Sequence, residues 1–199
     1  NEPTENNPFM GWHGIRRSID QPEILKFELE LIRKLYDEGI TNIVLGLPFI
    51  SSVDELRTVK QMAGFPLKVG IMIETPAAAL EAENFCKEGI EFAAIGLNDL
   101  TQLTLGVDRE NSKISKLYSE ANPAVVSLLK HVLRTCRKYN VETSVYGDFV
   151  SDQRVVELLV SLGVGSISTE PENLEEMRRI ISRTERRLIL ENIRNRPGI

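Results

Sequence analysis

One local pattern recurs along the chain and restricts the folds that it can adopt. A stretch with helical spacing of apolar residues ends at a glycine, and one apolar residue and a short β-rich run follow. The pattern occurs at Gly39-Ile40, Gly64-Phe65, Gly89-Ile90 and Gly163-Val164, and Asn140 takes the place of the glycine before a fifth run. A glycine just past a helix supplies the left-handed residue that ends it, and the next apolar residue starts a strand. The pattern therefore predicts alternating helices and strands.

The runs after these turns predict five strands, near 43–49, 68–74, 92–96, 142–147 and 164–168. All but the run at 142–147 are apolar on both alternations, which is typical of strands buried on both faces of a parallel sheet. Apolar residues spaced by three and four predict helices that cover this sheet. One such stripe comprises Ile24, Phe27, Leu31 and Leu35, and another comprises Val125, Leu128, Val132 and Cys136.

Helix starts are also indicated. Ser52 and Glu55 have the spacing of a capping box, Pro76 and Pro123 suit first turns, and Ser151 or Asp152 suits a cap. Strands that alternate with helices throughout indicate an α/β protein with a parallel sheet and about five βα units. The chain of 199 residues is short for a closed (β/α)8 barrel, which typically takes ~250, and an open doubly wound sheet fits the count as well. The periodicity does not choose between the two.

Composition restricts the kinds of binding partner that we expect and the cellular compartment of the protein. The net charge of -5 lacks the basic excess that nucleic-acid binding requires, and no apolar run is long enough to span a membrane. The first residues are polar and do not resemble a signal peptide, and Cys86 and Cys136 suit buried, reduced thiols, so we expect a cytoplasmic protein. The helix expected over about 171–191 carries five arginines, which we interpret as a solvated face: Arg178, Arg179, Arg183, Arg186 and Arg187.

Carboxylates stand where four of the predicted strands end, and both candidate folds place ligands at this edge. Asp148 and Glu170 are accounted for by a position near a helix N-terminus, where an acid caps backbone amides or interacts favourably with the helix dipole. Glu74 and Asp99 differ because they follow consecutive strands and should converge. Together with Asn98 they offer the oxygen ligands that Mg²⁺ prefers.

Other signatures of catalytic sites are missing from the sequence. It has no phosphate-binding glycine loop, zinc motif or nucleophile elbow. Of the two histidines, we expect His131 to be a surface or packing residue, whereas His13 lies in a loop-like segment and stays a candidate.

At these strand ends the sequence resembles the C-terminal domain of the phosphoenolpyruvate (PEP)-utilising enzymes. The resemblance rests on residues 70–79 (GIMIETPAAA) and 95–109 (IGLNDLTQLTLGVDR), with further agreement at 7–12 and 122–125. The family includes phosphoenolpyruvate synthase, the type nearest to this chain, pyruvate phosphate dikinase, and Enzyme I of the sugar phosphotransferase system. The resemblance implies a PEP/pyruvate-binding (β/α)8 TIM barrel, and we expect this chain to hold about five of its units and to lack its first strands.

The resemblance also implies roles for individual residues. Mg²⁺ would be held by Glu74 and Asp99, and it would bridge oxygens of the substrate during phosphoryl transfer to or from a histidine elsewhere. Asn98 and Arg109 match positions that contact phosphate and substrate. The backbone around Gly96 and Leu97 would add donors, and His13 and Arg16 lie in the segment that usually supplies an arginine.

Three departures from the family pattern put its chemistry in doubt. Tyr146 stands where the family has the cysteine that protonates the enolpyruvate carbon, and a phenol is a larger and weaker acid than a thiol. His13 replaces the usual arginine, and Val44 stands where Enzyme I has another phosphate-binding arginine.

These observations give one expected organisation and three functional hypotheses. We expect a polar segment over 1–8, the barrel domain over 9–192 and a tail over 193–199. The first hypothesis is the PEP/pyruvate-binding domain of a phosphotransferase, with phosphohistidine and nucleotide-binding domains elsewhere and a homodimer as the assembly. The second is a non-catalytic relative that binds ligand or dimerises. The third is a Mg²⁺-dependent lyase of the same barrel superfamily.

Overall fold

The chain forms a parallel β-sheet flanked by helices, and strands are present at all five predicted places. The computed structural model describes residues 4–148 and 152–195. Its strands are β1 (Leu45–Leu47), β2 (Val69–Ile73), β3 (Phe92–Gly96), β4 (Glu142–Tyr146) and β5 (Ser166–Ile167). Each strand pairs in parallel with the next, in the order β1-β2-β3-β4-β5.

The sequential strand order decides between the two architectures that the sequence left open. A doubly wound sheet reverses its strand order at a switch point, and the order of the described strands shows no reversal. Consecutive parallel strands joined by helices are the arrangement of neighbouring units in a (β/α)8 barrel. The described residues therefore form about five βα units of this kind, and β1 and β5 are the two edges of the sheet.

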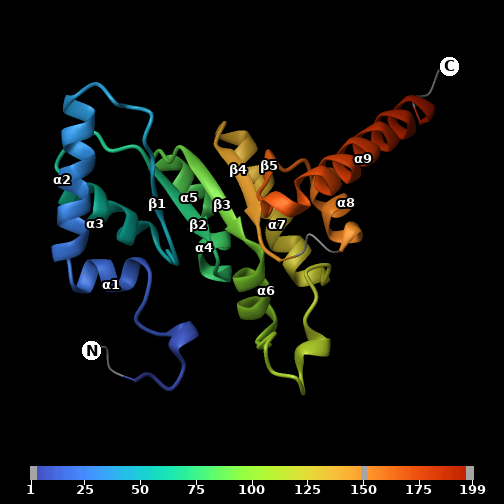
Figure 1. Ribbon diagram of the computed structural model, residues 1–199, viewed down its shortest axis with the longest axis horizontal. Coiled ribbons are helices and arrows are strands. Elements are labelled where there is room, and N and C mark those ends of the chain that lie inside the picture. The colour runs from blue at the N-terminus through green and yellow to red at the C-terminus, as the bar shows by residue number, and fades with distance from the viewer. Residues whose placement is uncertain (1–3, 149–151, 196–199) are drawn as a thin grey trace.

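Helices connect the strands and pack beside them. The α-helices are α1 (Ile15–Asp20), α2 (Glu23–Asp37), α3 (Val53–Ala63), α4 (Pro76–Leu80), α5 (Ala82–Lys87), α6 (Leu97–Leu105), α7 (Pro123–Lys138), α8 (Gln153–Leu162) and α9 (Leu174–Arg194). Short 3-10 helices are η1 (Pro8–Met10), η2 (Ser115–Leu117) and η4 (Pro171–Asn173). Figure 1 shows α2 and α3 at the β1 end of the sheet and α8 and α9 at the β5 end, with α9 extending away toward the C-terminus.

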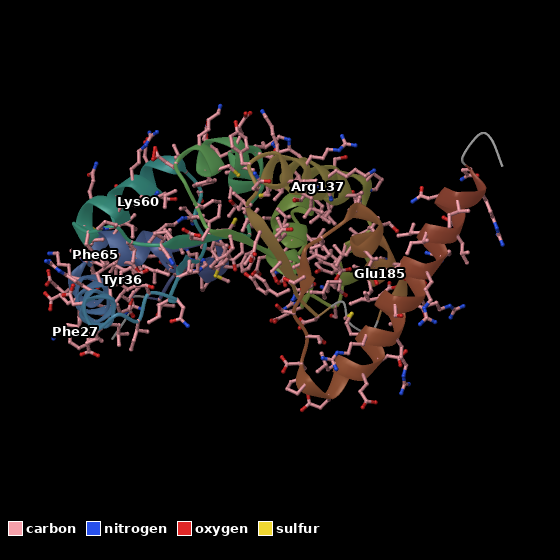
Figure 2. The ribbon with its side chains drawn as sticks, turned by 90° about the horizontal axis from the view of Figure 1, so that it is seen from above. Phe27, Tyr36, Lys60, Phe65, Arg137 and Glu185 are labelled. Atoms are coloured by element: carbon pink, nitrogen blue, oxygen red, sulfur yellow. The ribbon has the colours of Figure 1, made fainter. Side chains whose placement is uncertain are left out.

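The turns after the helices have the predicted left-handed geometry. Positive φ angles occur at all five expected positions, Gly39, Gly64, Gly89, Gly163 and Asn140. Two of these turns are held by cations from a neighbouring helix. Lys60 Nζ donates to the carbonyl oxygen of Gly89 at 3.1 Å, and Arg137 Nη2 donates to that of Gly163 at 3.1 Å (Figure 2).

The predicted helix starts are largely confirmed. Ser52 and Glu55 form the capping box of α3, and Pro76 and Pro123 occupy the first turns of α4 and α7. Asp152 caps α8 by accepting from the backbone N–H of Arg154. Ser151, the other candidate for this cap, lies outside the described residues.

Burial of the strands agrees with the prediction only at the centre of the sheet. In β2, Met72 alone is half-buried and the other residues are buried. In β1 only Leu47 is buried, and in β5 Ser166 is exposed. The prediction that these strands are buried on both faces is therefore wrong at the edges, because an edge strand has a neighbour on one side only.

The apolar face predicted for α2 is also wrong. Ile24, Phe27 and Leu31 are exposed by 64%, 61% and 42%, and Figure 2 shows Phe27 at the outer rim of the molecule. Leu25 and Leu29 are buried instead. The helix has two apolar stripes, and α2 packs against α1 and α3 rather than lying flat on the sheet. By contrast, Val125, Val132 and Cys136 of α7 are buried, with Leu128 partly buried, as predicted.

Cysteine, arginine and histidine side chains lie where the sequence placed them. Cys86 and Cys136 are free and buried in helices. The five arginines of α9 are exposed, and Arg187 pairs with Glu157 of α8 at 2.9 Å. His131 is exposed on α7. Helix α9 ends at Arg194, and the last residues of the predicted tail, 196–199, are outside the described part of the chain. No helix in the described ranges is long and apolar enough to cross a membrane.

Candidate functional site

The carboxylate of Glu74 lies at the end of β2 and is held from two sides. It is 5% exposed. Its Oε2 accepts from the backbone N–H of Phe49 at 2.7 Å, and its Oε1 accepts from the hydroxyl of Tyr146. Phe49 follows β1 and has a φ of 54°, which is uncommon for an aromatic residue. Residues at the ends of β1, β2 and β4 therefore meet at Glu74, since parallel strands end at the same edge of the sheet.

Asp99 lies in the first turn of α6, directly after β3, and faces the same edge. Burial, and next the negative charge of Glu74, raise the pKa of Asp99 above its ordinary value, whereas the charges of Arg109 and His13 act to lower it. The Asp99 carboxylate accepts no hydrogen bond from the described residues. The effect of the Glu74 charge on the pKa of Asp99 is consistent with the prediction that the two side chains converge.

This pair of carboxylates could hold a divalent cation. Two like charges in a partly buried place repel each other, and a cation between them would relieve this repulsion. Among residues 4–148 and 152–195, no group of three or more His, Cys, Asp or Glu side chains is arranged to hold a metal ion. Mg²⁺ fits such a pair because it is often bound by one or two carboxylates and completes its shell with water and substrate oxygens.

Tyr146 ends β4 and belongs to the same cluster. Its hydroxyl donates to Glu74, and burial together with this contact raises the pKa of Tyr146. The phenol is therefore neutral at pH 7. A Cβ built on Gly96 would lie 2.5 Å from the hydroxyl of Tyr146 and 2.7 Å from Cγ of Glu74. Only a residue without a side chain leaves room for the Tyr146–Glu74 contact, so Gly96 acts through its small size.

Asn98, Arg109 and Asp148 form a second group beside the carboxylate pair. Asp148 Oδ2 accepts from Asn98 Nδ2 at 2.9 Å and from Arg109 Nη1 at 2.5 Å. Asp148 does not cap α8, whose N-cap residue is Asp152. Glu170 stands at the N-cap position of η4, where its side chain makes no capping hydrogen bond, so that only the expected interaction of its charge with the helix dipole remains.

The N-terminal candidates are held mainly by backbone groups. His13 Nε2 lies 2.9 Å from the carbonyl oxygen of Phe9, and the ring packs edge-on against Phe49 at 4.1 Å. His13 is therefore close to the Glu74 side of the site. Arg16 donates to the carbonyls of Met10 and Gly11 and to Ser51 Oγ at 3.2 Å. These contacts tie Arg16 to the loop before α1 and to the start of α3, and not to Glu74 or Asp99.

The remaining candidate positions are Leu97, directly after β3, and Val44. The side chain of Leu97 is fully buried in the core, so that only its backbone can face a ligand. Helix α6 has no side-chain cap, which leaves the N–H groups of its first turn without that partner. Val44, just before β1, is half-buried and offers no charge.

Sequence analysis missed two contributors to this site. One is the backbone N–H of Phe49, although the end of the first predicted strand belongs to the same edge as the other strand ends. The other is Asp148 as a partner of Asn98 and Arg109. A carboxylate after a strand was visible in the sequence, but its partners, 50 and 39 residues away, carried no local signal.

Comparisons with known proteins show which proteins this chain is similar to. Residues 1–186 match the family model of the PEP-utilising enzyme, PEP-binding domain. The chain is 47% identical over 98% of its length to a probable phosphoenolpyruvate synthase of Methanocaldococcus jannaschii, and 44% identical over 94% to phosphoenolpyruvate synthase of Pyrococcus furiosus. It is 38% identical over 92% to a phosphoenolpyruvate-protein phosphotransferase of Buchnera aphidicola. The chain spans only 17%, 24% and 34% of these relatives.

Solved structures share the fold at low sequence identity. One is a HpcH/HpaI aldolase/citrate lyase family protein of Burkholderia cenocepacia, with a TM-score of 0.51 and 14% sequence identity. The match covers 84% of this chain and 70% of the Burkholderia chain. Another is RipC of Yersinia pestis, with a TM-score of 0.54 and 12% sequence identity. This match covers 69% of the present chain and 63% of the RipC chain. These likenesses support the α/β fold of the TIM-barrel type and concern the fold alone.

Proposed function

Because the chain belongs to the family of PEP-utilising enzymes, through their PEP-binding domain, we propose that it binds Mg²⁺ together with PEP or pyruvate. The binding site is the edge of the sheet where β2, β3 and β4 end. The observation that carries this proposal is the pair formed by Glu74, which is buried, and Asp99, whose pKa is raised by burial and by Glu74. Burying two carboxylates side by side costs free energy of folding, and a cation shared by the two side chains would explain why the protein has them.

Each side chain of the site has a role in this proposal. Glu74 and Asp99 hold Mg²⁺, which when bound supplies positive charge for the enolate and phosphate oxygens of the substrate. Asn98 and Arg109 bind the anionic groups of the substrate through their N–H donors. The N–H groups at the start of α6 add further donors. Phe49 orients Glu74 through its backbone N–H.

Tyr146 makes phosphotransfer by this chain doubtful while leaving binding intact. A proton donor to the enolpyruvate carbon must release its proton during the reaction. The hydroxyl proton of Tyr146 is engaged with Glu74, and the raised pKa makes Tyr146 a poorer acid than an ordinary phenol. This contact favours a second candidate function, a domain that binds the ligand without turning it over. The likeness to aldolase and lyase structures concerns the fold and does not favour lyase chemistry.

The whole protein and its assembly are also matters of proposal. The relatives are several times longer than this chain, and we infer that phosphohistidine and nucleotide-binding domains lie elsewhere in the complete protein. We further propose a cytoplasmic homodimer. Support for the dimer is the exposed apolar stripe of Ile24, Phe27 and Leu31 on α2.

Calorimetric titration of oxalate, a mimic of enolpyruvate, tests the proposal. We expect oxalate to bind in the presence of Mg²⁺ at least about tenfold more tightly than in its absence, since Glu74 and Asp99 repel an anion unless a cation lies between. Binding that is equal with and without Mg²⁺ would contradict the metal site. A folded sample that binds no oxalate under either condition would contradict the substrate site as well.

Replacing Asp99 by Asn should separate stability from metal binding. The pKa of Asp99 is raised in the folded protein, so the folded state binds its proton more tightly than the unfolded state does. The tighter binding of this proton stabilises the folded state at pH values below the ordinary pKa of an aspartate. The stabilisation is lost as the pH rises through the raised pKa. At pH 7 and without Mg²⁺, we therefore expect Asp99→Asn to melt about 2 °C higher than the parent protein, and the difference should vanish near pH 4.

Thermal unfolding followed by circular dichroism measures both effects. Mg²⁺ should raise the melting temperature of the parent protein and leave that of Asp99→Asn unchanged. Glu142→Gln is the matched control, because it removes one negative charge at the exposed opposite end of β4. If Asp99→Asn melts lower than Glu142→Gln at pH 7, Asp99 stabilises the fold and the cation argument fails.

A further inference from the structure

The carboxylate of Asp148 takes up the two side-chain donors that the proposed function assigns to the substrate. A single oxygen, Asp148 Oδ2, accepts from both Asn98 Nδ2 at 2.9 Å and Arg109 Nη1 at 2.5 Å. Donors from two different parts of the chain thus point at one place, and an acidic side chain occupies it. A carboxylate of this chain therefore stands where a carboxylate or phosphate oxygen of a ligand would be bound.

Other contacts place the two donors without the help of this carboxylate. The amide oxygen of Asn98 accepts from the backbone N–H of Asp148 at 3.1 Å, which fixes the direction of its Nδ2. The backbone N–H of Arg109 donates to Gln102 Oε1 at 2.8 Å, which anchors the start of the Arg109 side chain. Neither contact involves the side chain of Asp148. Loss of the Asp148 carboxylate should therefore leave both donors near their present positions, with nothing to bind.

The surroundings of Asp148 allow it to leave. Its side chain is 77% exposed, whereas that of Arg109 is 34% exposed. The acid thus approaches the donors from the solvent side and can rotate into water. Its charge also adds to those of Glu74 and Asp99, since Asp148 is one of the groups that raise the pKa of Asp99. An incoming anion consequently meets both a competitor for its donors and an additional negative charge.

We propose that Asp148 is a specificity-determining residue that competes with the substrate anion for Asn98 and Arg109. The inference rests on the proposed function, because it concerns the same anion site. A ligand binds only by displacing the Asp148 carboxylate into solvent. The apparent affinity of the ligand is therefore its intrinsic affinity multiplied by the fraction of molecules in which Asn98 and Arg109 are free of Asp148. A weakly bound anion is excluded, and one that also contacts Mg²⁺ is admitted.

Titration of oxalate into Asp148→Asn tests this inference. The neutral amide is a poorer acceptor for Arg109 and removes the repulsion, so we expect oxalate to bind about tenfold more tightly than to the parent protein. The matched control is Glu142→Gln, which removes the same charge at the other end of β4 and should bind oxalate as the parent protein does. Each protein is titrated with and without Mg²⁺.

The outcomes separate this inference from the proposed function. The proposed function fails if Mg²⁺ has no effect on oxalate binding, whatever the ratio between the two proteins. The inference fails if Asp148→Asn binds oxalate as the parent protein does or more weakly, since Asp148 would then position the donors rather than occupy them. It fails equally if neither protein binds oxalate, because the freed donors should then accept the anion. A gain in Glu142→Gln equal to that in Asp148→Asn would reduce the effect to net charge and overturn it too.

Discussion

Glu74→Gln is expected to abolish the Mg²⁺-dependent binding of oxalate, with a loss of affinity of at least about 100-fold. The substitution removes one of the two charges that could hold the cation. It also disturbs the local hydrogen bonds. Glu74 accepts from both the backbone N–H of Phe49 and the hydroxyl of Tyr146, and a glutamine has one acceptor oxygen and an amino group that cannot accept. If the glutamine oxygen accepts from Phe49, its N–H can donate to the hydroxyl of Tyr146, which then acts as an acceptor. Since this exchanges a charge-assisted hydrogen bond for a neutral one, we expect a loss of about 1 kcal/mol of stability.

The loss of affinity and the loss of stability need separate measurements. Calorimetry with oxalate, with and without Mg²⁺, gives the first, and urea unfolding gives the second. Glu142→Gln serves again as the control for the change of net charge, because Glu142 lies at the start of β4, opposite to the carboxyl ends of the strands where the site lies. A Glu74→Gln protein that stays folded and keeps the full Mg²⁺ effect would remove Glu74 from the metal site, and the carboxylate pair would lose its explanation.

The parallel sheet could be predicted because its signals are local. A glycine or Asn140 before each strand and a short apolar run after it are contained in a few adjacent residues. The choice between a barrel and a doubly wound sheet could not be predicted, because strand order depends on which edges pair. The face of α2 that is buried could not be predicted from the sequence either. Two apolar stripes lie on that helix, and only the packing against α1 and α3 determines that Leu25 and Leu29 are the buried ones.

The candidate site divides in the same way. Convergence of Glu74 and Asp99 followed from a general rule, that consecutive parallel strands end at the same edge. The contact between Tyr146 and Glu74 depends on register, which the sequence does not state. Ile73 pairs with Ile95, and Gly96 pairs with Tyr146. Glu74, the residue after β2, is therefore level with Gly96 and Tyr146, and the glycine between the two large side chains lets them meet.

That arrangement makes Gly96→Ala a strong test of the site, because it leaves every functional group of the site in the chain. The new Cβ would lie 2.5 Å from the hydroxyl of Tyr146 and 2.7 Å from Cγ of Glu74. Both distances are below van der Waals contact, so the two side chains must move apart. We expect a loss of about 1–3 kcal/mol in the free energy of unfolding. We also expect Mg²⁺-dependent oxalate binding to fall at least about tenfold, as Glu74 is displaced from Asp99.

Gly46→Ala is the matched control, since it makes the same change in β1 of the same sheet. A Cβ at Gly46 would meet only Cζ of Phe92, at 3.5 Å, which is an ordinary contact. Urea unfolding and oxalate calorimetry on both variants should therefore show a large effect for Gly96→Ala and a small one for Gly46→Ala. If Gly96→Ala loses stability yet binds oxalate as the parent protein does, the Tyr146–Glu74 contact serves the fold alone. Tyr146 would then have no part in shaping the proposed metal site.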